Sequence, residues 1–75
     1  MSQEIMLCEQ PAGRAARVVS VSPHSRIKYS AYGLVPGAVV ECLCRRTGAA
    51  AYAIGETVVV LRDTDCTAIT AEILP

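Results

Sequence analysis

The segment 28–37 (KYSAYGLVPG) most constrains the fold, because it predicts a short helix, a stop and a turn in quick succession. Tyr29 and Tyr32 lie three residues apart, so on a helix they share one face. Gly33 can adopt the left-handed conformation that ends a helix without a Cβ clash. The Pro-Gly pair at 36–37 favours a tight turn. The segment therefore predicts one short helix that leads directly into a strand.

The remainder of the chain is typical of a β-sheet protein. Hydrophobic residues make up 52% of its 75 residues, yet Trp and Phe are absent, so branched aliphatic side chains must build most of the core. Such side chains pack well on a pleated surface. Apolar or alternating runs predict strands over residues 14–22, 39–45, 50–54, 57–61 and 68–73. The length allows one domain, residues 1–75.

These elements predict an all-β fold: a small five-stranded barrel with one short α-helix between strands 1 and 2. Closing the sheet would remove its exposed edges. The valine-rich run 58–61 predicts a buried strand, and the alanine-rich run 50–54 predicts an edge strand. Ser22 or Ser25 is expected to cap the helix, which ends near Tyr32. Packing of Ile27, Tyr29 or Tyr32 must hold so short a helix on the sheet.

Two polar features have simple structural interpretations. The adjacent arginines Arg45 and Arg46 precede a Thr-Gly turn, which indicates a solvated loop end. Asp63 begins the motif Asp-Thr-Asp and is expected to cap a single helical turn.

The four cysteines admit three interpretations, namely buried thiols, a metal site or disulfides. Cys8 and Cys66 stand alone, and Cys42 and Cys44 lie two apart inside an expected strand, where side chains share one face. If Val40 faces the core, both thiols of that pair do so too. Buried apolar thiols are therefore favoured. The alternative is a thiol-based metal or redox module that combines Cys42 and Cys44 with Cys8 or Cys66.

Composition argues against several other functions. Seven basic and seven acidic residues cancel, which disfavours a nucleic-acid partner. No apolar run is long enough to cross a bilayer, and the first residues lack the features of a secretory signal, so we expect a cytoplasmic protein without direct membrane insertion. His24 is the only histidine, and no phosphate-binding glycine loop is present. We expect neither catalysis nor a bound cofactor or metal.

Three blocks of the sequence resemble the FeoA family of ferrous iron transport proteins. The central block contains Gly33, Leu34 and the Pro-Gly pair at 36–37 and is similar to the family pattern Arg-Leu-x-x-Leu-Gly-Leu-x-Pro-Gly, with Lys28 in place of the arginine. The residues of the other two blocks are Leu7, Gly13, Ala16 and Val18 before it, and Val59, Val60, Leu61, Arg62, Asp65 and the run 69–72 after it. The resemblance covers nearly the whole chain and implies an SH3-like barrel.

The resemblance also implies a function and a partner. FeoA proteins are accessory proteins of ferrous iron uptake, and the implied partner is the cytosolic G domain of a FeoB-like membrane GTPase permease. The mechanism would be contact-dependent modulation of that GTPase or of pore assembly, with no chemistry by this chain. Lys28, Tyr32, Leu34 and Val35 are the expected contact residues, with Leu34 and Val35 on an exposed turn.

Two further possibilities remain at this level. Similar domains form the C-terminal module of iron-dependent repressors, so the chain could be a regulatory domain of such a protein. It could also form a homo-oligomer.

A charge introduced at Leu34 discriminates between a contact residue and a core residue, because only at a core position would the charge unfold the domain.

Overall fold

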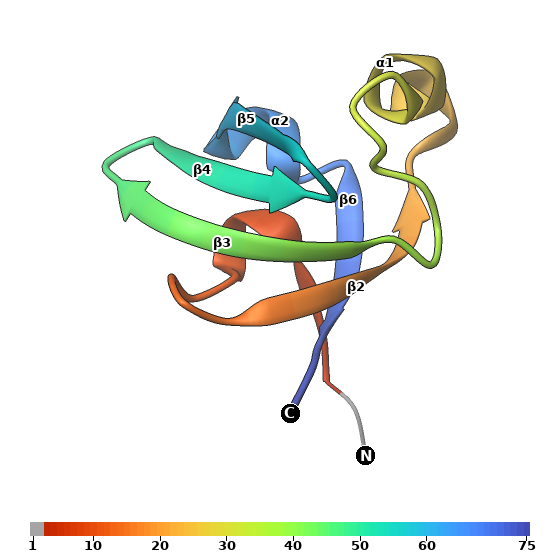
Figure 1. The fold of residues 1–75 in the computed structure, drawn as a ribbon. Coiled ribbons are helices and arrows are strands. Elements are labelled where there is room, and N and C mark those ends of the chain that lie inside the picture. The colour runs from red at the N-terminus through yellow and green to blue at the C-terminus, as the bar shows by residue number, and fades with distance from the viewer. Residues whose placement is uncertain (1–2) are drawn as a thin grey trace.

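A computed structural model of the chain describes residues 3–75 (Figure 1). Residues 1–2, part of the segment considered for a secretory signal, lie outside the described residues. In chain order the elements are β1 (Glu4–Met6), the 3₁₀ turn η1 (Leu7–Glu9), β2 (Ala15–Val21), the 3₁₀ turn η2 (Pro23–Ser25), α1 (Arg26–Ser30), β3 (Val39–Arg46), β4 (Ala49–Ile54), β5 (Thr57–Arg62), α2 (Asp63–Cys66) and β6 (Ile69–Ile73).

The strands form one antiparallel sheet in the order β1-β6-β2-β3-β4-β5. The prediction of a small all-β fold with a short helix between the first two long strands is confirmed, because α1 lies between β2 and β3. The sheet has six strands where the sequence predicted five. The additional strand is β1, which pairs with β6 through Glu4–Met6. Three residues are too few to show an alternation of apolar and polar side chains in the sequence.

The sheet has two ends, β1 and β5, and the described residues contain no strand pairing between them. The sheet is therefore not closed by hydrogen bonds, and α2 instead contacts η1 between the two ends. The edge prediction for β4 is wrong, since β4 pairs with β3 on one side and β5 on the other. The prediction that residues 58–61 form a buried strand is also wrong, because β5 is an edge whose outer face is exposed.

Residues from five of the strands, β2 to β6, together with η1, α2 and the α1 segment, build one core. Its buried hydrophobic members are Leu7, Ala16, Val18, Val21, Tyr29, Leu34, Val40, Cys42, Ala50, Tyr52, Ile54, Leu61, Cys66, Ile69 and Ala71. Two tyrosines are the largest of them, which compensates for the absence of Trp and Phe. Branched aliphatics fill much of the remainder, as composition predicted.

Two bulges decide which side chains face this core. In β2 the register shifts between Val18 and Ser20, so that Val21 joins Val18 on the buried face. In Figure 1 β2 turns upward past β3 before it reaches α1, and a bulge bends a strand in this way. In β3 the register shifts between Cys42 and Cys44. Because Leu43 is the extra residue, strict alternation fails there.

Candidate functional site

The α1 segment lies at one corner of the molecule, away from the centre of the sheet (Figure 1). Five residues are too few for a helix that is stable by itself. Tyr29 holds it in place: its ring is buried, and its hydroxyl donates a hydrogen bond to the backbone carbonyl of Asp65 at 3.0 Å. This bond joins α1 to α2. Burial, followed by the nearby negative charge of Asp65, raises the pKa of Tyr29, so the phenol stays protonated.

The end of the helix segment has the hydrogen-bond pattern of a Schellman motif. The amide of Leu34 donates to the carbonyl of Tyr29, and the amide of Gly33 donates to the carbonyl of Ser30, both at 3.0 Å. Gly33 has the predicted left-handed conformation, with φ of +85°. A Cβ at this position would lie 3.2 Å from Cγ2 of Ile54, so the glycine also permits close approach to β4.

Leu34 is not on an exposed turn, and that expectation is wrong. Its side chain is only 1% exposed. In a Schellman motif the residue after the left-handed glycine packs against the last helical turn, here against the buried Tyr29. Leu34 therefore belongs to the core and offers no surface to a partner.

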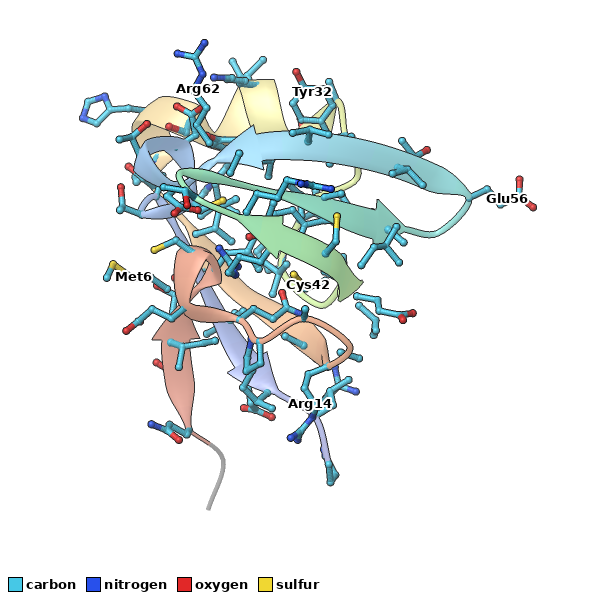
Figure 2. All side chains as sticks on the ribbon, turned by 90° about the vertical axis from the view of Figure 1, so that its left-hand side faces the viewer. Met6, Arg14, Tyr32, Cys42, Glu56 and Arg62 are labelled. Carbon is cyan, nitrogen blue, oxygen red and sulfur yellow. The ribbon has the colours of Figure 1, made fainter. Side chains whose placement is uncertain are left out.

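The other three expected contact residues are exposed. Tyr32 packs its ring near that of Tyr29, with ring centroids 6.4 Å apart, and still faces solvent (Figure 2). The Lys28 ammonium lies 5.4 Å from the centre of the Tyr29 ring, a cation–π arrangement. Val35 is exposed just before the Pro36 turn. The structure thus brings Lys28, Tyr32 and Val35 to one segment around a buried tyrosine anchor.

Ile27 is an exposed apolar residue, although the sequence interpretation offered it, with Tyr29 and Tyr32, as a residue that could pack on the sheet. It is 89% exposed, so Ile27 does not anchor the helix, whereas the buried Tyr29 does. A usable signal existed: residues two apart on a helix point to opposite sides, so burial of Tyr29 excludes burial of Ile27. We define Ile27, Lys28, Tyr32 and Val35 as the α1 surface.

The turn after the helix fixes the position of the α1 surface. The amide of Ala38 donates to the carbonyl of Val35 at 2.9 Å, and Gly37 has φ of +94°, which matches the predicted Pro-Gly turn. Gly37 also donates to the carbonyl of Val18 in β2 at 2.8 Å. The exit of the segment is therefore tied to the sheet, and its helix is tied to α2 through Tyr29.

The α1 surface is apolar with positive charge. Between Pro23 and Ala38 the chain carries Arg26 and Lys28 and no acidic residue. Neither cation forms an ion pair among the residues that the structure describes. Such a surface suits recognition of a protein face that is apolar at its centre and acidic at its rim.

A second polar cluster centres on Arg45, and the prediction that Arg45 is a solvated loop end is wrong. Its guanidinium donates to the Tyr52 hydroxyl at 2.9 Å and to Asp63 Oδ1 at 3.1 Å. It also donates to the backbone carbonyls of Leu7 and Gln10, at 3.3 Å and 3.1 Å. The bulge in β3 turns Arg45 inward, so the cluster joins η1, β4 and α2.

Asp63 does begin the single turn α2, as predicted, but its side chain makes no capping hydrogen bond. It pairs with Arg45 instead. Likewise neither Ser22 nor Ser25 caps its helix through the side chain, although Pro23 occupies the expected first position of η2. The Arg45 cluster is structural, because its two backbone carbonyls and two side chains tie separate elements to the sheet.

The cysteines do not converge. Cys42 is buried beside Val40 as predicted, but Cys44 is exposed on the opposite face because of the bulge at Leu43. Burial raises the pKa of Cys66, whose sulfur lies 3.7 Å from the Tyr52 hydroxyl. Within residues 3–75 no group of three or more His, Cys, Asp or Glu side chains is placed to hold a metal ion. The pairing of Cys42 with Cys44 in a thiol-based module therefore has no geometric support.

The helices of the structure also bear on whether the chain could cross a membrane. Among the described residues, no helix combines the length and the apolar character that a transmembrane crossing requires.

Fold and surface together define a class: a small SH3-like β-domain that carries a rigid apolar and basic corner. Comparison with known proteins narrows the class. The model of the FeoA domain family matches residues 5–73, and the chain belongs to this family. Comparison with curated protein sequences gives no significant match.

Solved structures agree with this assignment. The crystal structure of an iron uptake regulatory protein (FeoA) is 22% identical, with a TM-score of 0.87, over 96% of this chain and 99% of that one. The FeoA-like protein from Clostridium acetobutylicum is 22% identical, with a TM-score of 0.88, over 100% of this chain and 92% of that one. FeoA from Chlorobium tepidum is 28% identical, with a TM-score of 0.83, over 95% of this chain and 71% of that one.

A manganese-dependent transcriptional repressor shares the fold as well. It is 22% identical, with a TM-score of 0.85, and the match covers 99% of this chain but 44% of the repressor. At this identity the similarity concerns the fold alone. The resemblance seen in the sequence is thus confirmed at the level of family and fold, and the family is associated with ferrous iron transport.

Proposed function

We propose that this chain is a cytoplasmic accessory protein of ferrous iron uptake that binds the G domain of a FeoB-like membrane GTPase permease. It would act by contact alone and modulate the GTPase or the assembly of the pore. Membership of the FeoA family supports the link to iron uptake. The partner and the contact mechanism rest on the α1 surface.

One observation carries this proposal: the chain fixes exposed apolar residues on and just after a helix too short to be stable by itself. Folding gains little from Ile27 at 89% exposure, whereas binding would bury it. Tyr32 adds an exposed aromatic ring, a residue type enriched in protein interfaces. Anchoring by Tyr29 and by the turn at Gly37 keeps the surface preorganised, which lowers the entropic cost of binding.

The basic residues suggest how the partner is oriented. Lys28 and Arg26 would face acidic side chains at the rim of the partner's contact area. Rim charges mainly accelerate association and make it sensitive to salt. Leu34 acts beneath this surface as a core residue, and we no longer include it among the contacts.

The test is binding of the purified chain to the cytosolic G domain of the FeoB-type permease from the same genome, measured by calorimetry. Ile27→Glu and Val35→Glu should each weaken binding at least about tenfold. Leu43→Glu is the matched control, because Leu43 is 44% exposed and Val35 is 41% exposed, but Leu43 lies in the β3 bulge. Thermal unfolding of each variant verifies that the fold is retained.

The proposal fails if the wild-type chain does not bind the G domain, or if Leu43→Glu weakens binding as much as the two α1 variants do. GTP hydrolysis measured with and without the chain then separates modulation of the GTPase from simple binding.

A further inference from the structure

The free edge of β5 lacks most of the features by which natural sheets protect their edges, since charges stand only at its two ends. β1, at the other end of the sheet, has three residues, whereas β5 has six and pairs with β4 without a register shift. Residues 57–61 contain no charge and no proline. Charged residues, proline, bulges or very short strands usually prevent edge-to-edge pairing. A long, regular and apolar edge instead favours pairing with another strand.

Hairpin geometry shows which backbone groups of this edge are free. Ile54 pairs with Thr57 across a two-residue loop, and Gly55 at its first position has φ of +61°. In such hairpins the residues that flank the loop form a hydrogen-bonded pair, and hydrogen-bonded and non-bonded pairs then alternate. Thr57, Val59 and Leu61 therefore bond to β4. The amides and carbonyls of Val58 and Val60 point away from β4, to the free edge.

The sequence of β5 is self-complementary about Val59. We propose that β5 pairs antiparallel with β5 of a second copy of this chain, forming a twofold dimer with the axis at Val59. In this register Val58 of each copy lies opposite Val60 of the other, and their free amides and carbonyls are the groups that bond. The two Val59 residues form the non-bonded pair at the axis.

Charge complementarity selects the same register. Glu56 and Arg62 stand at opposite ends of β5, as Figure 2 shows. Pairing Val58 with Val60 places Glu56 of each copy opposite Arg62 of the other, so the dimer contains two such ion pairs. A shift of two residues in either direction would lose the charge match and leave only one of the three valine pairs. Neither charge has an ion-pair partner within its own chain among residues 3–75.

The side chains of the edge are apolar and exposed in the single chain. Val58 is 61% exposed and Val60 is 72% exposed, and both lie on the outer face of the sheet. Across from them on β4 are Ala53 and Ala51. Val60 and Ala51 also line a shallow concavity of about 150 Å³ on this face. In the dimer, Val58 and Val60 of both copies would lie together beside the alanines of β4, and this contact would remove apolar surface from water.

The proposed β5–β5 interface is small, so we expect the dimer to be weak. Stable dimers usually bury about 1,200–2,000 Å² in total. The area buried by one strand pair with its valines lies at or below the lower end of this range. We expect a monomer–dimer equilibrium that shifts with protein concentration and with salt. The α1 surface lies on a separate segment, so this proposal does not depend on the proposed function.

Sedimentation velocity over a range of concentrations tests the dimer. Glu56→Arg and Arg62→Glu should each raise the dissociation constant about tenfold, because each places like charges opposite one another at two sites. The double variant E56R/R62E should restore the wild-type dissociation constant. Glu4→Arg, at the exposed edge β1, is the matched control and should change nothing.

The register has its own test in a mixture of isotope-labelled and unlabelled chains. Intermolecular contacts between the α-protons of the two Val59 residues should appear in filtered NMR spectra, since non-bonded antiparallel pairs bring Cα atoms within about 4.5 Å. A chain that stays monomeric at millimolar concentration overturns the proposal. So does a dimer whose dissociation constant is unchanged by both Glu56→Arg and Arg62→Glu, or one whose intermolecular contacts lie outside β5.

Discussion

The guanidinium of Arg45 and the hydroxyl of Tyr52 are hydrogen-bonded at 2.9 Å, and both donate to the same backbone carbonyl, that of Leu7. The ring of Tyr52 is fully buried. Together they hold η1 on the sheet, because they add two side-chain hydrogen bonds to a carbonyl that already accepts one from the Gln10 amide. Two side chains of the central hairpin thereby hold the N-terminal segment on the sheet.

Arg45→Ala should destabilise the domain by about 3 kcal/mol, because it leaves buried carbonyls and the Tyr52 hydroxyl with fewer partners. The adjacent Arg46→Ala should cost less than about 0.5 kcal/mol, since Arg46 is exposed. Urea unfolding of the two variants measures the difference in the free energy of unfolding. Equal stability of the two would show that the Arg45 cluster contributes nothing.

Leu34→Ala should cost about 2–5 kcal/mol, the usual range for a buried leucine. Val35→Ala at the next position should cost less than about 0.5 kcal/mol, because that side chain is exposed. Denaturant midpoints of the two variants decide between core and surface. A stable Leu34→Asp variant would instead restore Leu34 to the candidate contact residues.

Gly33→Ala tests the close approach of α1 to β4. Both Gly33 and Gly13 have a positive φ, +85° and +84°, so alanine at either position pays the left-handed cost of about 1–2 kcal/mol. Only at Gly33 would the new Cβ meet a side chain, Cγ2 of Ile54 at 3.2 Å; at Gly13 nothing lies within 4 Å. Gly33→Ala should therefore be the more destabilising of the two in thermal unfolding. Equal costs would mean that Ile54 moves aside freely.

The comparison of sequence and structure shows which features are local. Gly33 and the Pro-Gly turn were predictable because each depends on backbone conformations that few residues adopt. The bulges at Val19 and Leu43 were not, because a one-residue shift depends on the partner strand and leaves no mark on the alternation of apolar residues. The exposure of Cys44 and the inward turn of Arg45 both follow from the second bulge.

The order of the strands in the sheet was likewise not predictable from the sequence. Residues 57–61 are the most apolar strand, which favours burial, yet the hairpin order places them at an edge. Alanines in β4 predicted an edge, but small side chains also suit a strand covered by neighbours on both sides. Within the candidate site, the exposure of Val35 was predicted from sequence, whereas Leu34 was misplaced because the Schellman motif returns it to the core.

Thiol labelling should resolve the cysteines into classes under reducing conditions. Cys44, the exposed thiol, should react first with a disulfide reagent, and half-buried Cys8 more slowly. Cys42 and Cys66 should react only as the domain unfolds, because both are buried. Cys44→Ser should remove the fast phase and leave the others unchanged. A fast phase that persists in this variant would contradict the orientation set by the β3 bulge.

Stability should fall at alkaline pH because of Cys66 and the buried tyrosines. Burial raises the pKa of Cys66 above its ordinary value of 9.0, and burial likewise raises the pKa values of Tyr52 and Tyr29 above 10.0. As pH rises through 9.0 the unfolded chain loses the Cys66 proton while the folded chain retains it. The unfolded state then binds fewer protons, so the free energy of unfolding decreases with pH.

The contribution of Cys66 is complete below its unfolded pKa and is lost as pH rises towards the folded one. Urea unfolding with a reducing agent present should show that the free energy of unfolding decreases between about pH 7 and about pH 10. Cys66→Ala should be less stable at neutral pH, since it leaves a small cavity beside Tyr52, but should show a smaller loss over the same interval. A loss of the same size in the variant would assign the alkaline effect to the tyrosines and remove Cys66 from the explanation.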